Sequence, residues 1–256
     1  MEQAQSVHIA AYIEELSSKV AAPSVKQKLA ALRMLFDWLV IRQVLPANPA
    51  HAVRGPKRVV KKGKTPVLSA EETRSLLDSI DTGSLVGLRD RALIALLVFS
   101  FARVGAAVGM KVEDVYIQRK RTWIRLHEKG GKEHSMPAHH TLEAYLDAYI
   151  AAAGIASDPS SALFRSTVGR SGELTERPLR QPDVYRMIRR RAAQAGIHTR
   201  IDCHTFRATG ITEYLRNGGK LEIAQEMANH ESARTTGLYD RRQDQVSLDE
   251  IERILI

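Results

Sequence analysis

The sequence of 256 residues contains one cysteine, Cys203, and only 5% aromatic residues. A single cysteine can form neither an internal disulfide bond nor a cluster of thiolate metal ligands. The most apolar stretch, residues 92–102, is bounded by arginines and is 11 residues long, whereas a membrane span needs about 18 or more. The first ten residues lack the basic and apolar segments of a secretory signal. We therefore expect a cytoplasmic protein with no membrane partner.

Several cofactor and metal motifs are also missing. The sequence has no GxxxxGK[ST] phosphate loop, no GxGxxG that opens a helix, and no HExxH pair. His139 and His140 are adjacent, and on a helix adjacent side chains point about 100° apart, which makes them a poor metal pair. The sequence therefore predicts no ATP, no other cofactor and no structural metal.

The charge balance favours a polyanionic partner. Lys and Arg number 38 against 29 Asp and Glu, which gives a net charge of +9, and the isoelectric point is about 9.8. Hydrophobic residues make up 44% of the chain and charged residues 26%, as in ordinary globular proteins. The excess positive charge suits a nucleic acid but does not by itself identify one.

Helical spacing of apolar residues predicts two helices at the start of the chain, over 6–20 and 24–44, with Ser24 as the cap of the second. Two helices alone rarely bury enough apolar surface to be stable, so exposed apolar side chains are expected here. Residues 54–66 contain six Lys or Arg, no acid, two Gly and two Pro. This composition predicts an extended basic linker between a small domain, 1–56, and a larger one, 67–256, with the linker proper at 57–66.

The larger domain is expected to be mainly α with a small antiparallel β-sheet. Ser69 and Glu72 form a capping box that opens a helix. Period-2 patterns predict three short strands, and helical patterns predict most of the rest. The predicted strands are 115–117, 122–126 and 135–137, and the predicted helices are 69–77, 84–102, 139–153, 180–195, 204–216, 219–228 and 246–255.

Four local patterns could carry chemistry. Arg103 follows the most apolar helix, and Lys129 lies in a basic hairpin over 127–137. His204 and Arg207 are three residues apart and so share a helical face. The fourth pattern is Asn229-His230, followed nine residues later by Tyr239. Each pattern alone has an ordinary explanation, such as a helix-end arginine, a solvated lysine, a surface pair or a helix cap.

In this order, however, the patterns resemble the tyrosine recombinase family, also called the phage integrases, from Ser6 to the C-terminus. The resemblance is carried by Ser100-Phe-Ala-Arg103, Glu-Lys129-Gly-Gly-Lys with Pro137, Cys-His204-Thr-Phe-Arg207, Asn-His230, and Thr-Thr-Gly-Leu-Tyr239, preceded by Asn48-Pro49 and the basic linker. One departure from the family pattern matters for the chemistry. Three residues after the first arginine the family usually has an acid that orients active-site groups, and here the residue is Ala106. Loss of such a supporting residue is expected to affect the rate more than the reaction.

The resemblance implies a DNA strand-exchange enzyme with the tyrosine recombinase catalytic fold and a shortened helical, SAM-like core-binding domain. It implies transesterification through a 3′-phosphotyrosine intermediate, which stores the bond energy and needs no ATP. Tyr239 would be the nucleophile, His204 the general base and Lys129 the general acid, with Lys132 as a rival. Arg103 and Arg207 would clamp the phosphate, and His230 would donate a hydrogen bond to it.

The expected partner is double-stranded DNA, bound by a homotetramer on two duplexes, with possible accessory DNA-bending proteins. The amphipathic stretch 247–255 is a candidate for exchange between neighbouring subunits. Two alternatives stay open: a catalytically weak DNA-binding regulator of the same family, and a type IB-like nicking-closing topoisomerase. The residues expected to contact DNA are Lys57, Arg58, Lys61, Lys62, Lys64, Lys132, Arg180, Arg186, Arg189 and Arg190.

Overall fold

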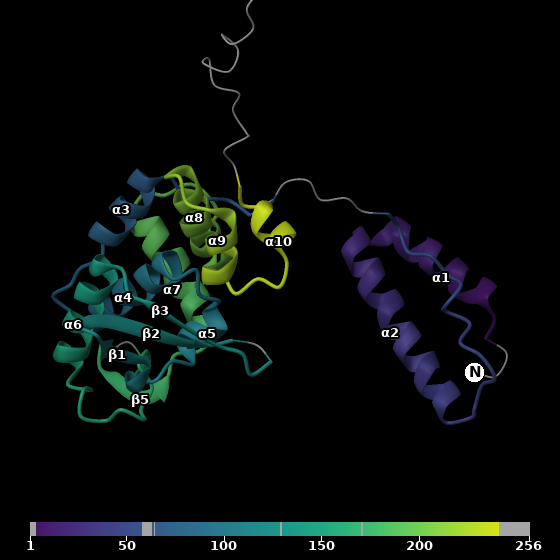
Figure 1. The fold of residues 1–256 in the computed structure, drawn as a ribbon, viewed down its shortest axis with the longest axis horizontal. Helices are drawn as coiled ribbons and strands as arrows, with labels where there is room; N and C mark the ends of the chain where they lie inside the picture. The colour runs from purple at the N-terminus through teal and green to yellow at the C-terminus, as the bar shows by residue number, and fades with distance from the viewer. Residues whose placement is uncertain (1–3, 58–62, 64, 129, 170, 241–256) are drawn as a thin grey trace, which may run out of the picture. The chain divides into compact units, whose positions relative to one another are not determined.

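The structure is a computed structural model that describes residues 4–57, 63, 65–128, 130–169 and 171–240. The chain divides into two compact units, residues 1–61 and 62–256 (Figure 1). The division lies inside the stretch 57–66 that the sequence identifies as a linker. Of the expected linker contacts, Lys57 is described and exposed, whereas Arg58, Lys61, Lys62 and Lys64 lie outside the described residues.

The first unit is built on two helices, α1 (Ser6–Lys19) and α2 (Ala22–Ile41). Helix α2 begins two residues before the predicted Ser24, because Ala21 is its N-cap and Pro23 occupies the first turn, where its fixed φ and missing N–H suit a helix start. The prediction that Ser24 caps this helix was therefore wrong.

The first unit also has a third element that the sequence analysis did not foresee. After α2 the chain turns back, and Leu45, Ala50 and Val53 are buried against α1 and α2. Arg33 fastens this return segment by donating hydrogen bonds to the carbonyl oxygens of Ala50 and Val53. The core of the unit is therefore larger than two helices alone would make it. Apolar side chains nevertheless remain exposed, as predicted, among them Met34, Trp38 and Ile41 of α2.

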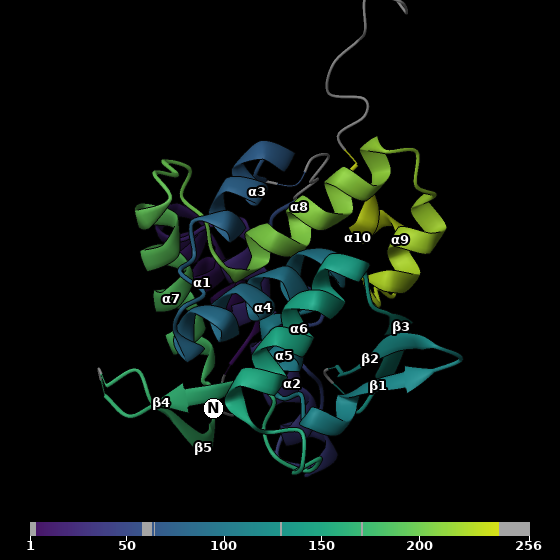
Figure 2. The same ribbon diagram turned by 90° about the vertical axis from the view of Figure 1, so that its left-hand side faces the viewer.

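The second unit is mainly helical with two small antiparallel sheets, which confirms the predicted fold class (Figures 1 and 2). The helices are α3 (Ala70–Asp78), α4 (Leu85–Phe99), α5 (Val104–Val108), α6 (His140–Ala153), α7 (Gln181–Gln194), α8 (Cys203–Arg216), α9 (Leu221–Met227) and α10 (Ala233–Gly237), with a 3-10 turn at Val112–Asp114. The strands are β1 (Val115–Gln118), β2 (Arg121–His127), β3 (Glu133–Pro137), β4 (Arg165–Thr167) and β5 (Leu174–Pro178). The predicted helix over 246–255 lies outside the described residues.

Helix α4 forms the centre of the second unit. Its residues from Ala92 to Val98 are all buried, and it packs against both α6 and α8. Ser84, the first residue of the predicted helix 84–102, is its N-cap, but the helix ends at Phe99 rather than at residue 102. Gly210 of α8 allows the closest approach to α4, because a Cβ at this position would lie 2.1 Å from the carbonyl oxygen of Val98. The backbone of α8 is thereby held against the end of α4, where Arg103 follows.

The three-stranded sheet has the order β1-β2-β3, with Ile124 of the central strand opposite both Val115 and Met136. The second sheet, β4-β5, was not predicted. Its strands are three and five residues long and carry no buried side chain, so they lack the apolar alternation that signals a strand. Among the described residues, no helix has the length and apolarity needed to cross a membrane.

Candidate active site

The expected catalytic side chains come from separate elements of the second unit. Arg103 is the N-cap of α5, His204 and Arg207 lie on the first turns of α8, His230 follows α9, and Tyr239 follows α10. The β2–β3 hairpin lies on the same side of the unit as α9 and α10 in both Figure 1 and Figure 2, and Lys132 of the hairpin pairs with Glu231 at 2.8 Å. Lys129 lies outside the described residues.

Tyr239 is a buried phenol in contact with a histidine. Its hydroxyl lies 2.7 Å from Nε2 of His204, and its side chain is largely covered. Burial raises the pKa of Tyr239, although Arg207 and Arg103 oppose this shift. Burial lowers the pKa of His204, and the charge of Arg207 acts in the same direction. The pair therefore consists of a neutral phenol and a neutral imidazole that can accept its proton.

Arg207 is fixed in the interior beside this pair. Its side chain is 1% exposed, and its two terminal nitrogens donate hydrogen bonds to the carbonyl oxygens of Phe101 and Ala228. The Nε atom is buried without a hydrogen-bond partner among the described residues. Burial and the neighbouring charge of Arg103 lower the pKa of Arg207 to about 10, so it remains a cation near neutral pH.

Two residues with left-handed backbone lie at the points that Arg207 holds. Phe101 has φ +55° and Asn229 has φ +45°, a conformation that costs free energy for residues other than glycine. Arg207 bonds to the carbonyl of Phe101 and to the carbonyl that precedes Asn229. The segments carrying Arg103 and His230 are thus both fastened to one arginine side chain.

His230 completes the set of groups around the phenol. Its ring stacks on that of Tyr239 with the centroids 6.1 Å apart and 12° between the planes. Its Nδ1 lies 2.9 Å from the hydroxyl oxygen of Thr236, and burial and the charge of Arg207 lower the pKa of His230 to about 4. In the tautomer whose Nδ1 accepts from the Thr236 hydroxyl, the proton of the neutral imidazole is on Nε2, which leaves one N–H free to donate.

Three further residues contact the catalytic side chains or their backbone, and no role was predicted for them from the sequence. Glu128 is buried and pairs with Arg103 at 2.7 Å. Thr212 donates a hydrogen bond to the carbonyl oxygen of Tyr239 at 3.0 Å. Thr236 is part of the Thr-Thr-Gly-Leu-Tyr239 motif, so the sequence did contain a signal that it belongs to the site. Glu128 stands among lysines and glycines, where a solvated glutamate is the ordinary interpretation.

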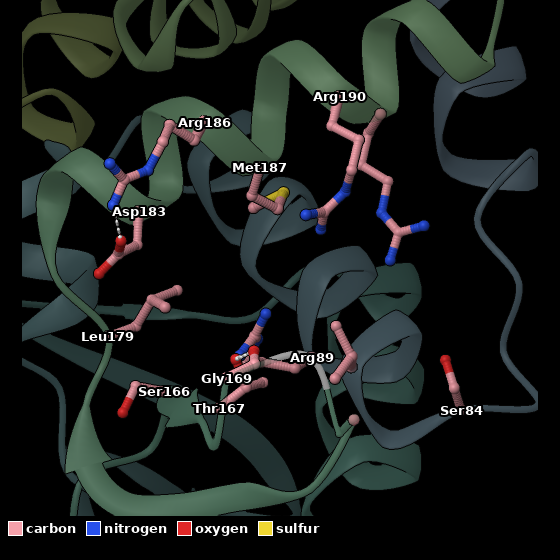
Figure 3. Close-up of a pocket in the computed structure, with 13 residues that line it drawn as sticks. Ser84, Arg89, Ser166, Thr167, Gly169, Leu179, Asp183, Arg186, Met187 and Arg190 are labelled. Atoms are coloured by element: carbon pink, nitrogen blue, oxygen red, sulfur yellow. Dashed lines mark hydrogen bonds and ion pairs between the residues drawn. The ribbon is translucent and has the colours of Figure 1, made fainter.

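The described arginines that were expected to contact DNA are exposed on helix α7 or at its N-cap, Arg180. Two of them, Arg186 and Arg190, border a cavity of about 650 Å³ between α7 and the β4–β5 hairpin (Figure 3). Arg186 pairs with Asp183 at its rim, and Arg189 lies over the ring of Tyr185. Whether these side chains contact DNA stays a prediction.

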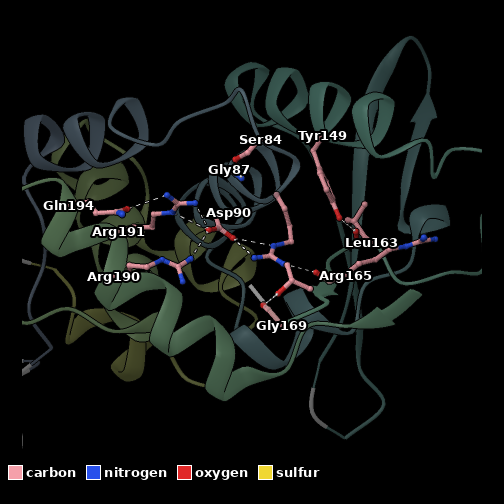
Figure 4. Close-up of polar contacts among 12 residues, drawn as sticks. Ser84, Gly87, Asp90, Tyr149, Leu163, Arg165, Gly169, Arg190, Arg191 and Gln194 are labelled. Atoms are coloured by element: carbon pink, nitrogen blue, oxygen red, sulfur yellow. Dashed lines mark hydrogen bonds and ion pairs between the residues drawn. The ribbon is translucent and has the colours of Figure 1, made fainter. Parts of the chain in front are cut away.

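Arg190 has a partner inside the protein as well. Asp90 of α4 is fully buried, and its Oδ2 lies 2.8 Å from Arg191 and 3.4 Å from Arg190, while Oδ1 accepts two hydrogen bonds from Arg89 (Figure 4). A buried carboxylate is tolerated because it is paired and fully hydrogen-bonded. Two of the basic side chains of α7, Arg190 and Arg191, therefore join this helix to α4.

We expect Asp90→Ala to lower the free energy of unfolding by about 3–5 kcal/mol, because it leaves the buried guanidinium of Arg89 without its counter-charge. Denaturant unfolding of the whole chain measures the effect. Asp183→Ala is the matched control: its pair with Arg186 is solvent-exposed, so about 1 kcal/mol or less is expected. Equal losses for the two variants would contradict the structural role of Asp90.

The lowered pKa of His204 predicts the pH dependence of proton removal from Tyr239. A depressed folded-state pKa keeps the imidazole neutral below its ordinary value of 6.5, so the second-order rate of tyrosine attack should stay level from pH 7 down to 6.5 and fall only at lower pH. Pre-steady-state rates against pH measure this. An acid limb at or above pH 6.5, or an identical limb in His204→Gln, would contradict the assignment.

Comparison with known proteins identifies the family. The family model "Phage integrase family" matches residues 66–246. A tyrosine recombinase of Pseudothermotoga lettingae is 28% identical over 97% of this chain and 82% of its own length. The tyrosine recombinase XerC of Myxococcus xanthus is 30% identical over 96% of this chain and 79% of its own.

Solved structures share the fold. The XerH site-specific recombinase bound to a palindromic difH substrate has a TM-score of 0.75 and 20% identity, covering 99% of this chain and 73% of that one. A lambda integrase dimer bound to a COC′ core site has a TM-score of 0.69 and 20% identity, covering 96% and 83%. The chain belongs to the phage integrase family, the tyrosine recombinases, and its activity is site-specific cleavage and rejoining of DNA.

Proposed function

We propose that this chain exchanges strands between two double-stranded DNA molecules through a covalent bond between Tyr239 and a 3′-phosphate. The contact of 2.7 Å between the tyrosine hydroxyl and His204 carries the proposal. This contact lies beside Arg207 and Arg103, whose charges act on both groups. A nucleophile, a base and two phosphate-binding cations are the groups that transesterification at a phosphodiester requires.

In the proposed reaction, His204 takes the proton as the oxygen of Tyr239 attacks phosphorus. The bond from phosphorus to the 5′-oxygen breaks, and Lys129 supplies the proton to the leaving oxygen. Arg103, Arg207 and the free N–H of His230 hold the non-bridging oxygens, on which negative charge develops. A 5′-hydroxyl of the second duplex then attacks the phosphotyrosine, which releases Tyr239 and restores the phosphodiester.

The proposed assembly is a homotetramer on two duplexes, with residues 247–255 exchanged between neighbours and accessory DNA-bending proteins as possible partners. The solved relatives bound to difH and core-site DNA support the DNA partner. Exposed Lys57 and the arginines of α7 are proposed to contact the phosphate backbone.

The test starts from duplexes enriched by binding to this chain from a random-sequence pool. Two such duplexes of different length, one radiolabelled, should yield recombinant products and a protein–DNA adduct that survives denaturation. DNA binding without any adduct would instead identify a DNA-binding regulator. Relaxation of supercoiled plasmids that lack the selected sequence, with no recombinants, would favour the topoisomerase alternative.

We expect cleavage to continue in excess EDTA, because arginine and histidine side chains, rather than a metal ion, are proposed to bind the phosphate. Adduct formation on the selected duplex with and without chelator measures this. A nuclease that depends on carboxylate-bound Mg²⁺ would lose cleavage in EDTA and regain it on adding Mg²⁺, and that result would contradict the mechanism.

A further inference from the structure

Glu128 is the one acidic side chain among the described residues that is buried against the cations of the site. Its side chain is 3% exposed, and its Oε2 lies 2.7 Å from Nη1 of Arg103. The proposed reaction uses a tyrosine, cations and imidazoles, so it gives this carboxylate no role. A buried carboxylate is costly unless it is paired, and Arg103 is its partner.

Arg103 has no other side-chain hydrogen bond among the described residues. It is the N-cap of α5, makes no capping hydrogen bond with its side chain, and is 42% exposed. The charge of Arg103 also disfavours the charged form of Arg207, whereas Glu128 favours it. Two like charges therefore act on each other at the site before DNA binds, and Glu128 supplies a negative charge that offsets their repulsion.

The backbone of Glu128 is held in the hairpin. Glu128 follows β2, whose residue Leu126 is buried, and its N–H donates to the carbonyl oxygen of Lys132 at 2.7 Å. Gly130 and Gly131, with φ +83° and +75°, turn the chain between these two residues. The position of the acid is thus set by the sheet.

Small residues leave room for this side chain. Gly105 and Ala106 line a cavity of about 560 Å³ together with Arg103, Glu128 and His204. Tyrosine recombinases usually have an acid at the position of Ala106, and here the carboxylate that meets Arg103 comes from the hairpin instead. Among the described residues, Glu128 binds only Nη1 of Arg103, so Nη2 and Nε remain available to a phosphate.

We propose that Glu128 is a positioning residue that holds the Arg103 guanidinium in the orientation that binds the scissile phosphate. This inference rests on the proposed function, because it assigns Arg103 to the reacting phosphate. It also explains how the chain can remain active with alanine at position 106.

A double-mutant cycle with Arg103 tests the proposal. The probe is the duplex selected from the random pool, with single-turnover adduct formation and DNA affinity measured separately. Glu128→Gln should slow adduct formation about 10-fold or more while DNA affinity stays unchanged. In the Arg103→Ala background the same substitution should cause no further slowing, because Glu128 acts through Arg103. Glu133→Gln, on the same hairpin and 56% exposed, is the matched control and should keep the wild-type rate.

Three results would overturn the proposal: a wild-type rate in Glu128→Gln, a faster rate, or full slowing that persists without Arg103. A faster rate would mean that Glu128 blocks the phosphate site. A failure of the proposed function itself would be distinguishable, because the wild-type chain would then form no adduct.

A measurement without DNA tests the orientation directly. The {¹H}–¹⁵N heteronuclear NOE of the Arg103 Nε–H should be high in the wild-type chain and in Glu133→Gln, as for an ordered side chain, and low in Glu128→Gln. An equally high value in Glu128→Gln would overturn the positioning role whatever the activity of the enzyme.

Discussion

Tyr239→Phe is expected to abolish the covalent protein–DNA adduct and leave DNA affinity unchanged. The substitution removes only the hydroxyl that lies 2.7 Å from His204. The buried ring can keep its stacking on His230, and Arg103 and Arg207 still provide the phosphate-binding charges. Denaturing gel electrophoresis with the labelled selected duplex measures the adduct, and a mobility-shift titration measures affinity.

Tyr214→Phe is the matched control, because Tyr214 lies on α8 and packs edge-on against Phe101 through its ring. It should form the adduct at the wild-type rate. An adduct in Tyr239→Phe, or its loss in both variants, would contradict the assignment of the nucleophile.

Arg207→Lys is expected to slow adduct formation about 10²–10³-fold, the usual cost of losing a preorganised donor to a developing negative charge. Lysine keeps the charge, but its single ammonium cannot bind two backbone carbonyls and a phosphate oxygen in the planar geometry of a guanidinium. The carbonyls of Phe101 and Ala228 would lose a bidentate partner, so the segments before Arg103 and His230 should also loosen.

Single-turnover kinetics measure this loss, with unfolding followed in parallel to separate rate from stability. Arg216→Lys is the control on the same helix, since Arg216 pairs with Glu213 at the surface, and it should be as active as wild type. A rate for Arg207→Lys within tenfold of wild type would show that charge alone suffices at this position.

The helices with long apolar patterns were predictable from the sequence. The capping box at Ser69 forms as expected, with Glu72 bonded back to the Ser69 backbone. The start of α2 was not predictable from the sequence, because a proline in the first turn competes with a serine one residue later. Short elements such as α5 and α10 have five residues each, too few for a helical period to be read.

For the site, local sequence patterns identified the candidate side chains, but they could not show that these side chains lie close together in the structure. Residues 103 and 239 are far apart in sequence, and only the order of the motifs and their family resemblance suggested one site. The structure shows which of these side chains are buried and which groups they contact. Arg207 is buried and bonded to two carbonyls, and Glu128 is buried and paired with Arg103. Neither fact is visible in a sequence where arginine and glutamate are ordinarily solvated.

In the proposed reaction Tyr239 forms the bond to DNA, and mass spectrometry of the trapped adduct identifies the residue that carries it. After nuclease and trypsin digestion, the peptide 235–241 should carry the mass of a nucleotide 3′-phosphate, with fragmentation placing it on Tyr239. The same mass on any other residue, or an unmodified peptide 235–241 recovered from a purified covalent adduct, would contradict it.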